Sequence, residues 1–214
     1  MRLSSPSRRR SSRRRSTTAA LAAALLTGVG AAAPPSMAVA LPRETAQGYA
    51  LRSVAELSAR RLATGDLVAA AKWGTGSPVD DPARERQVLD SAADRAEGLG
   101  ADPRLTRLVF RDQIEANKAV QRGLHRRWRD HPYEAPAGRP RLDDVRKEVD
   151  RLNEALVRAV ADSAPYRRAA PPCRVAPAVS AGRVSRERSL DALHATALAG
   201  SLKSVCGSRR QHAG

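Results

Sequence analysis

The spacing of apolar residues is the feature that most constrains the fold of this chain. Between about residues 45 and 205, apolar side chains recur at intervals of three and four, which places them on one face of an α-helix. Strand signals are few, and aromatic residues make up only 3% of the sequence. The sequence therefore predicts an all-α fold, a single helical domain of about five or six helices.

Proline and glycine mark where these helices begin and end. An aspartate stands directly before Pro82 and another directly before Pro103. The carboxylate can cap the first amides of a helix, and proline fits the first helical position. Gly65-Asp66 is expected to interrupt the first helical pattern before "LVAAAKW" resumes it. The predicted helices cover about residues 45–64, 81–99, 102–128, 142–163 and 179–205, with loops at 74–78, 131–140 and 164–177.

The first 40 residues are predicted to lie outside this domain. Residues 1–18 carry seven arginines and no acid, residues 19–33 are apolar, and Ala38 and Ala40 form an A-x-A pattern. This order is typical of a secretory signal peptide that is cleaved from the mature protein. We therefore expect a signal peptide over 1–40 and one domain over 41–214. The alternative, an uncleaved membrane anchor, is disfavoured because the apolar run is short and rich in Ala and Gly.

Net charge leaves a second class of function open. The whole chain has a formal charge of +16, which falls to +9 when the seven arginines of residues 1–40 are removed. A basic secreted helical binding module, for nucleic acid or an anionic surface, is compatible with that charge. The scarcity of aromatic residues for base stacking counts against it.

The mature sequence contains two cysteines, Cys173 and Cys206. In an exported protein an even pair predicts a disulfide, and two free buried thiols are the alternative. No Cys-x-x-Cys or His-x-x-x-His spacing accompanies them, so no metal site is predicted.

Several polar residues have spacings that bring them onto common helix faces. Arg61 and Lys72 are eleven residues apart, three turns of an uninterrupted helix. Surface ion pairs and solvated faces would explain such residues without any function. A row of amides is harder to explain in that way. The remaining candidates are the cluster Asp81, Arg84 and Glu85, the amide stripe Gln113, Asn117 and Gln121, and Arg146, which sits between two valines.

Three segments together resemble the all-helical chorismate mutases. They are "ARRLATGDLVAAAKW", "SPVDDPARERQVL" and "FRDQIEANKAVQ". The export signal, the single domain and the C-terminal cysteine pair are similar to the secreted subclass of that family. The resemblance covers nearly the whole mature chain. Its matching residues are Arg61, Lys72, the D-x-x-R-E of Asp81, Arg84 and Glu85, and the N-x-x-x-Q of Asn117 and Gln121.

The resemblance implies conversion of chorismate to prephenate without cofactor or metal. It implies that Arg61 and Arg146 bind the substrate carboxylates, with Arg84 assisting nearby. Lys72 is expected to reach one carboxylate and the ether oxygen whose bond breaks, and Gln121 to donate to the same oxygen. Lys72, Gln121 and Arg61 are thus the expected catalytic residues.

The remaining roles also follow from the resemblance. Glu85 is expected to accept from the substrate hydroxyl, Asp81 to orient that group or an arginine, and Asn117 to hold a carboxylate or a water. Val88 departs from the polar residue of some relatives and makes the floor of the pocket more apolar. Arg146 is expected from the same chain as Arg61.

The resemblance also bears on location and partners. It implies a secreted or extracytoplasmic protein, with no stable membrane association after cleavage, no nucleic-acid partner and a homodimeric assembly. A helical domain that kept the fold and lost the activity is a further alternative.

Overall fold

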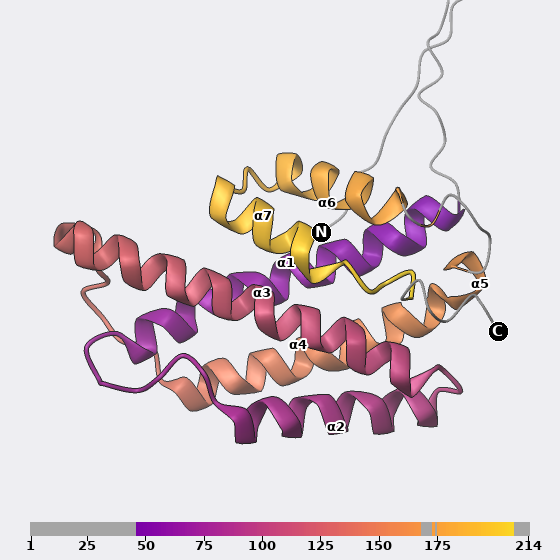
Figure 1. The fold of residues 1–214 in the computed structure, drawn as a ribbon, viewed down its shortest axis with the longest axis horizontal. Coiled ribbons are helices and arrows are strands. Elements are labelled where there is room, and N and C mark those ends of the chain that lie inside the picture. Colours follow the sequence, from indigo (N-terminus) through magenta and orange to yellow (C-terminus); the bar gives the residue numbers. More distant parts are fainter. Residues whose placement is uncertain (1–45, 168–172, 174, 208–214) are drawn as a thin grey trace, which may run out of the picture. The chain divides into compact units, whose positions relative to one another are not determined.

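The computed structural model describes residues 46–167, 173 and 175–207, and these residues form an all-α domain (Figure 1). The predicted fold class is therefore confirmed. The predicted signal peptide, residues 1–40, lies outside the described residues. The helices are α1 (Ala46–Lys72), α2 (Pro82–Gly98), α3 (Pro103–Asp130), the 3₁₀ helix η1 (Pro132–Glu134), α4 (Leu142–Asp162), α5 (Ala164–Arg167), α6 (Ala176–Glu187) and α7 (Ala192–Ser201).

Both predicted Asp-Pro helix starts are confirmed. The Asp81 carboxylate accepts from the amide of Arg84, and the Asp102 carboxylate accepts from the amides of Arg104 and Leu105. These contacts satisfy amides that the helices cannot pair internally. The two caps therefore fix where α2 and α3 begin.

The predicted interruption at Gly65-Asp66 is wrong, because α1 runs through it without a break. A β-carbon at Gly65 would lie 3.1 Å from the side-chain nitrogen of Asn117 on α3. Glycine costs a helix about 1 kcal/mol relative to alanine. Here it allows a polar side chain of the neighbouring helix to approach the backbone of α1. The glycine marks close helix packing rather than a helix end.

The single helix predicted over 179–205 is also a misassignment, since the structure has two helices there. α6 ends near Arg188, Ser189 has a φ of +50°, and the Asp191 carboxylate caps α7 by accepting from the His194 amide. An aspartate with a local capping partner favours a new helix start over continuation. The predicted loop at 164–177 likewise contains the single turn α5.

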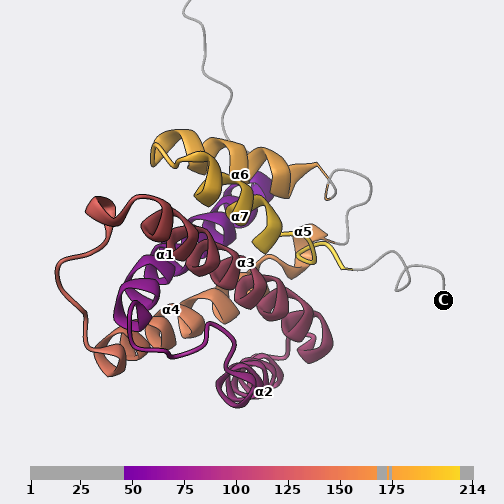
Figure 2. The same ribbon diagram turned by 60° about the vertical axis from the view of Figure 1, so that its left-hand side comes forward.

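Helix α1 lies at the centre of the packing. It contacts α3, α4, α6 and α7, while α2 packs against α3 and α4 (Figure 1). Figure 2 views α2 nearly end-on at the bottom, with α3 and α4 above it and the α6–α7 pair at the top, at the opposite end of the view from α2. The pocket described below lies where α1, α2, α3 and α4 meet.

Small residues allow these helices to approach closely. Ala55 and Ala69 of α1 are fully buried, and Phe110 of α3 is the largest fully buried side chain. A β-carbon at Gly123 would lie 2.7 Å from a methyl group of Leu193, so α3 and α7 meet at that glycine. None of the helices in the described ranges is long and apolar enough to cross a membrane.

The predicted disulfide is present between Cys173 and Cys206, whose Cα atoms are 5.8 Å apart. It joins residues 33 positions apart in the sequence and closes a loop that contains α6 and α7. Such a crosslink stabilises the fold mainly by reducing the conformational freedom of the unfolded chain.

We expect Cys173→Ser to lower the free energy of unfolding by roughly 3–4 kcal/mol, and the melting temperature by roughly 10 °C. The measurement is thermal unfolding followed by circular dichroism without reductant. Repeating both melts with reductant is the control, because reduced wild type should then match the variant. Equal melting temperatures without reductant would show that the crosslink contributes nothing to stability.

Candidate active site

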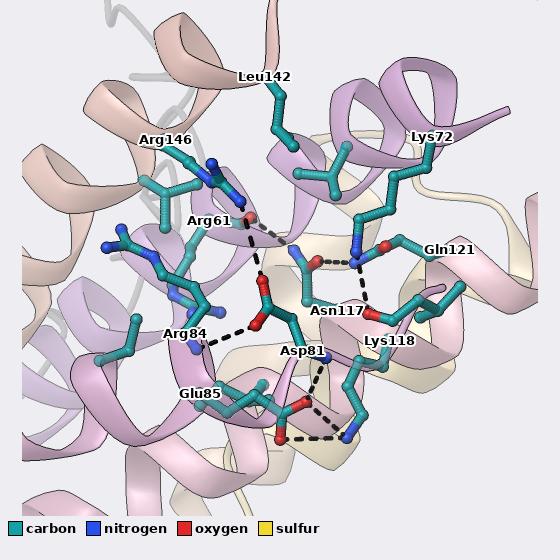
Figure 3. Close-up of a pocket in the computed structure, with 15 residues that line it drawn as sticks. Arg61, Lys72, Asp81, Arg84, Glu85, Asn117, Lys118, Gln121, Leu142 and Arg146 are labelled. Atoms are coloured by element: carbon teal, nitrogen blue, oxygen red, sulfur yellow. Dashed lines mark hydrogen bonds and ion pairs between the residues drawn. The ribbon is translucent and has the colours of Figure 1, made fainter. Parts of the chain in front are cut away.

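A pocket opens between α1, α2, α3, α4 and the segment that joins α1 to α2 (Figure 3). Eight of the nine residues that the sequence singled out as site candidates line it, and Gln113 does not. Its other lining residues are Lys118 and six aliphatic side chains. The eight candidates are Arg61, Lys72, Asp81, Arg84, Glu85, Asn117, Gln121 and Arg146.

Arg61 is a buried cation that connects three helices. Its side chain, on α1, donates to the Asn153 side-chain oxygen of α4 at 2.8 Å and to the Gln113 carbonyl of α3 at 3.0 Å. Burial lowers the pKa of its guanidinium to about 10, and the nearby Arg84 acts in the same direction. The group therefore remains protonated at neutral pH and is held rigidly in the pocket wall.

Lys72 is the last residue of α1. Its ammonium donates to the carbonyls of Pro78 and Val79, at 2.8 and 3.1 Å, in the segment before α2. Burial lowers the pKa of Lys72, while the neighbouring Asp81 opposes that shift. The lysine therefore presents a compact, partly desolvated positive charge at one side of the pocket.

The first turn of α2 carries the clustered charges. The Asp81 carboxylate caps the helix and lies 3.8 Å from the Arg146 guanidinium of α4. Glu85 lies one turn further on and also lines the pocket. The carboxylate that caps α2 therefore also faces the arginine of a different helix.

Arg84 lines the pocket but directs its guanidinium toward α4. It donates to Asp150 at 2.6 Å and to Gln87 at 2.8 Å. Figure 3 shows its charged end turned away from Lys72 and Gln121. The charge of Arg84 therefore acts on the pocket from its wall, beside Arg61.

Two amides of α3 are joined in the pocket. Gln121 donates to the side-chain oxygen of Asn117 at 2.8 Å, and Asn117 donates to the Arg61 carbonyl at 3.3 Å. Because Asn117 gives its N–H to that carbonyl, its oxygen faces Gln121. The amide nitrogen of Gln121 then has a second N–H, which its bond to Asn117 does not use. Its oxygen is buried and has no hydrogen-bond partner in the described part of the chain.

The third member of the amide stripe does not reach the pocket. Gln113 is fully buried and donates to the Ser58 hydroxyl at 2.7 Å and to the Ser201 carbonyl at 3.1 Å. It therefore connects α3 to α1 and α7 in the core. The stripe separates into a structural glutamine and two pocket residues.

Lys118 is the charged pocket residue that sequence reasoning missed. Its side chain is only 11% exposed, and its ammonium contacts the carboxylates of Asp80, Glu85 and Glu115 at 3.1, 3.2 and 2.7 Å. Burial lowers the pKa of Lys118, but the hydrogen bonds that its ammonium donates to these three acids outweigh burial and raise the pKa overall. The available signal was the spacing of Ile114, Lys118 and Gln121, which share one face of α3.

The pocket is positively charged on balance and has apolar walls. Five cationic and two acidic side chains line it, so it favours an anionic ligand. Val88 is 8% exposed and forms part of the wall, consistent with the apolar floor expected from the sequence. The described residues contain no cluster of His, Cys, Asp and Glu that could hold a metal ion.

Comparisons with known proteins agree on one family. The profile of the family "Chorismate mutase type II" matches residues 52–122. The secreted chorismate mutase of Mycolicibacterium smegmatis is 32% identical over 169 residues, which span 78% of this chain and 93% of that protein. The secreted chorismate mutase of Mycobacterium tuberculosis is 30% identical over 156 residues, spanning 73% of this chain and 78% of that protein.

The fold is likewise similar to solved structures of that family. The crystal structure of chorismate mutase from Burkholderia phymatum superposes with a TM-score of 0.71 at 37% sequence identity, covering 77% of this chain and all of that one. The structure of the Burkholderia thailandensis enzyme gives a TM-score of 0.69 at 36% identity, covering 73% of this chain and 99% of that one.

Proposed function

Because the chain belongs to the chorismate mutase family, we propose that its positively charged pocket rearranges chorismate to prephenate. One observation carries the proposal: eight of the nine residues chosen from the sequence, spread over 86 positions, line a single pocket. Two amides and five cations there suit a small dianion, and the aliphatic walls reduce its contact with water.

The reaction asks for positioning and charge stabilisation. Chorismate has two carboxylates, a hydroxyl and an ether oxygen, and the rearrangement is an intramolecular Claisen reaction. Holding the compact conformer brings the two reacting carbons together. Donors aimed at the ether oxygen lower the barrier as negative charge develops on it. A rate acceleration of ~10⁶-fold corresponds to roughly 8 kcal/mol.

Arginines suit the carboxylates because a guanidinium can bind both oxygens. Arg61 is fixed by its bonds to Asn153 and Gln113, so it offers a preorganised contact. Arg146 is 42% exposed and forms two long ion pairs, with Asp81 at 3.8 Å and with Asp143 at 3.5 Å. It can exchange the Asp81 contact for a substrate carboxylate at low cost. Arg84 assists through its charge in the wall.

Lys72 and Gln121 act on the ether oxygen in this proposal. The ammonium of Lys72 exchanges two backbone carbonyls for the substrate, and Gln121 contributes its second amide N–H. A compact ammonium charge and an amide donor stabilise the oxygen where the bond breaks. Glu85 accepts from the substrate hydroxyl, Asp81 orients Arg146, and Asn117 orients Gln121.

We also propose that the protein is exported, with residues 1–40 as the cleaved signal, and that it forms a homodimer without stable membrane association. The basic and apolar order of residues 1–40 supports export, as do relatives that are secreted enzymes. N-terminal sequencing of secreted protein should begin at residue 41, and sedimentation equilibrium should give twice the mass of one chain. A mature protein beginning at Met1, or a single-chain mass, would contradict the respective part.

Lys72→Ala should reduce kcat/KM for chorismate at least ~10²-fold, because it removes a donor to the developing negative charge. Loss of chorismate absorbance with purified mature protein is the measurement. Lys147→Ala is the matched control, since Lys147 is an exposed lysine of α4 that pairs with Asp144 outside the pocket. Wild-type turnover by Lys72→Ala would refute the role of Lys72.

The same assay tests the alternative function. If the wild type itself leaves chorismate unchanged and instead shifts DNA mobility in a salt-sensitive way, the basic binding module is the better assignment.

The pH dependence tests the role of Gln121. An amide donates at any pH, so wild-type kcat/KM should stay level between pH 5 and 8. Gln121→Glu should be active at pH 5 and lose rate as pH rises, because only the protonated carboxylic acid can donate. A wild-type rate that falls steeply between pH 5 and 8 would contradict the role of Gln121 as a donor that does not depend on pH.

A second pH effect concerns Lys72. At alkaline pH the rate of the wild type should begin to fall at a pH below the usual pKa of lysine, since burial lowers the pKa of Lys72.

A further inference from the structure

We propose that Lys118 is a positioning residue that fixes the carboxylate of Glu85 as the acceptor for the substrate hydroxyl. This inference rests on the proposed function and adds a residue to it. Lys118 lines the same pocket as Glu85 but comes from α3, whereas Glu85 comes from α2.

The contact between the two residues is geometrically specific. The Lys118 ammonium lies 3.2 Å from one Glu85 carboxylate oxygen and 3.3 Å from the other. A cation close to both oxygens holds the carboxylate in position through two charge-assisted hydrogen bonds. The other polar contact of Glu85 is weak, at 3.4 Å from the amide of Asp81. Without Lys118, little in the described structure would set the orientation of this side chain.

The electrostatic surroundings show why a fixed cation is needed here. Asp80, Asp81 and Glu85 place three carboxylates within six residues at the start of α2. Other charges near the cluster come from Lys72 on α1, from Arg84 on α2, from Glu115 and Arg122 on α3 and from Arg146 on α4. Lys72 is bound to carbonyls of the α1–α2 segment and Arg84 to Asp150. Lys118 is the cation that bonds Glu85 directly.

Lys118 also connects the helices that carry the pocket. Its ammonium bridges Glu85 to Asp80, and Asp80 accepts two further bonds from Arg122 at 2.7 and 2.8 Å. Arg122 therefore anchors the same segment to α3 without contacting Glu85. Lys118 and Arg122 both hold Asp80 to α3, but of these two cations only Lys118 also bonds Glu85. This difference makes Arg122 a matched control.

A double-mutant cycle separates positioning from general support of the fold. kcat and KM for chorismate are measured for wild type, Lys118→Met, Glu85→Gln and the double variant. In the wild-type background, Lys118→Met should reduce kcat/KM about tenfold. In the Glu85→Gln background it should reduce kcat/KM by less than about twofold, because the effect of Lys118 passes through Glu85. Lys118→Arg keeps the cation and should recover most of the lost rate. Arg122→Met should stay within about twofold of wild type.

Each outcome decides between explanations. Independent effects, in which Lys118→Met costs the same factor in both backgrounds, would overturn the positioning role, and so would an equal loss in Arg122→Met. If Lys118→Met fails to fold, the Lys118→Arg and Glu85→Gln variants still test the proposal. Lys118→Arg retains a cation and must then keep most of the wild-type rate. Wild-type protein without chorismate turnover would overturn the proposed function and this inference together, whereas an active wild type with independent effects overturns only the inference.

Discussion

A guanidinium buried in the interior must find acceptors, and that requirement organises this domain. Arg61 on α1 meets it with an oxygen from α4 and a carbonyl from α3, so three helices are fixed around one positive charge. The same carbonyl belongs to Gln113, whose side chain reaches the Ser201 carbonyl at the end of α7. The charge that faces the pocket is therefore rigid because the core around it is hydrogen-bonded, and a rigid charge is what electrostatic catalysis of chorismate rearrangement needs.

The small residues of α1 make this arrangement sterically feasible. Buried alanines and Gly65 let α3 approach until Asn117 lies against the backbone of α1. Asn117 then directs Gln121, and the pocket gains an oriented amide beside Lys72. The alanine run before Lys72, which looks like generic helix sequence, sets the distance between the two helices. The charges at the start of α2 face the same pocket because the Asp81 cap fixes where that helix begins.

Local signals in the sequence predicted what local interactions control. Asp-Pro pairs marked the starts of α2 and α3 correctly, and the cysteine pair predicted its disulfide. Gly65 was misread because the reason for it lies on another helix, which no local pattern contains. The stripe from Gln113 to Gln121 divided because each step of four residues turns a side chain by about 40°, so its two ends meet different neighbours. No local sequence pattern placed Lys118 in the pocket, because its acidic partners come partly from a helix that is distant in sequence.

The pocket candidates from Arg61 to Arg146 are all carried by one polypeptide. Under the proposed export this arrangement matters, because an exported protein is diluted once it leaves the cell. Groups on separate subunits part when the protein concentration falls below the dissociation constant of the assembly. Groups joined by a continuous backbone keep their effective concentration at any dilution. The covalent connection between α1 and α4 therefore keeps the arginines of this pocket together even for a molecule that never meets a second copy.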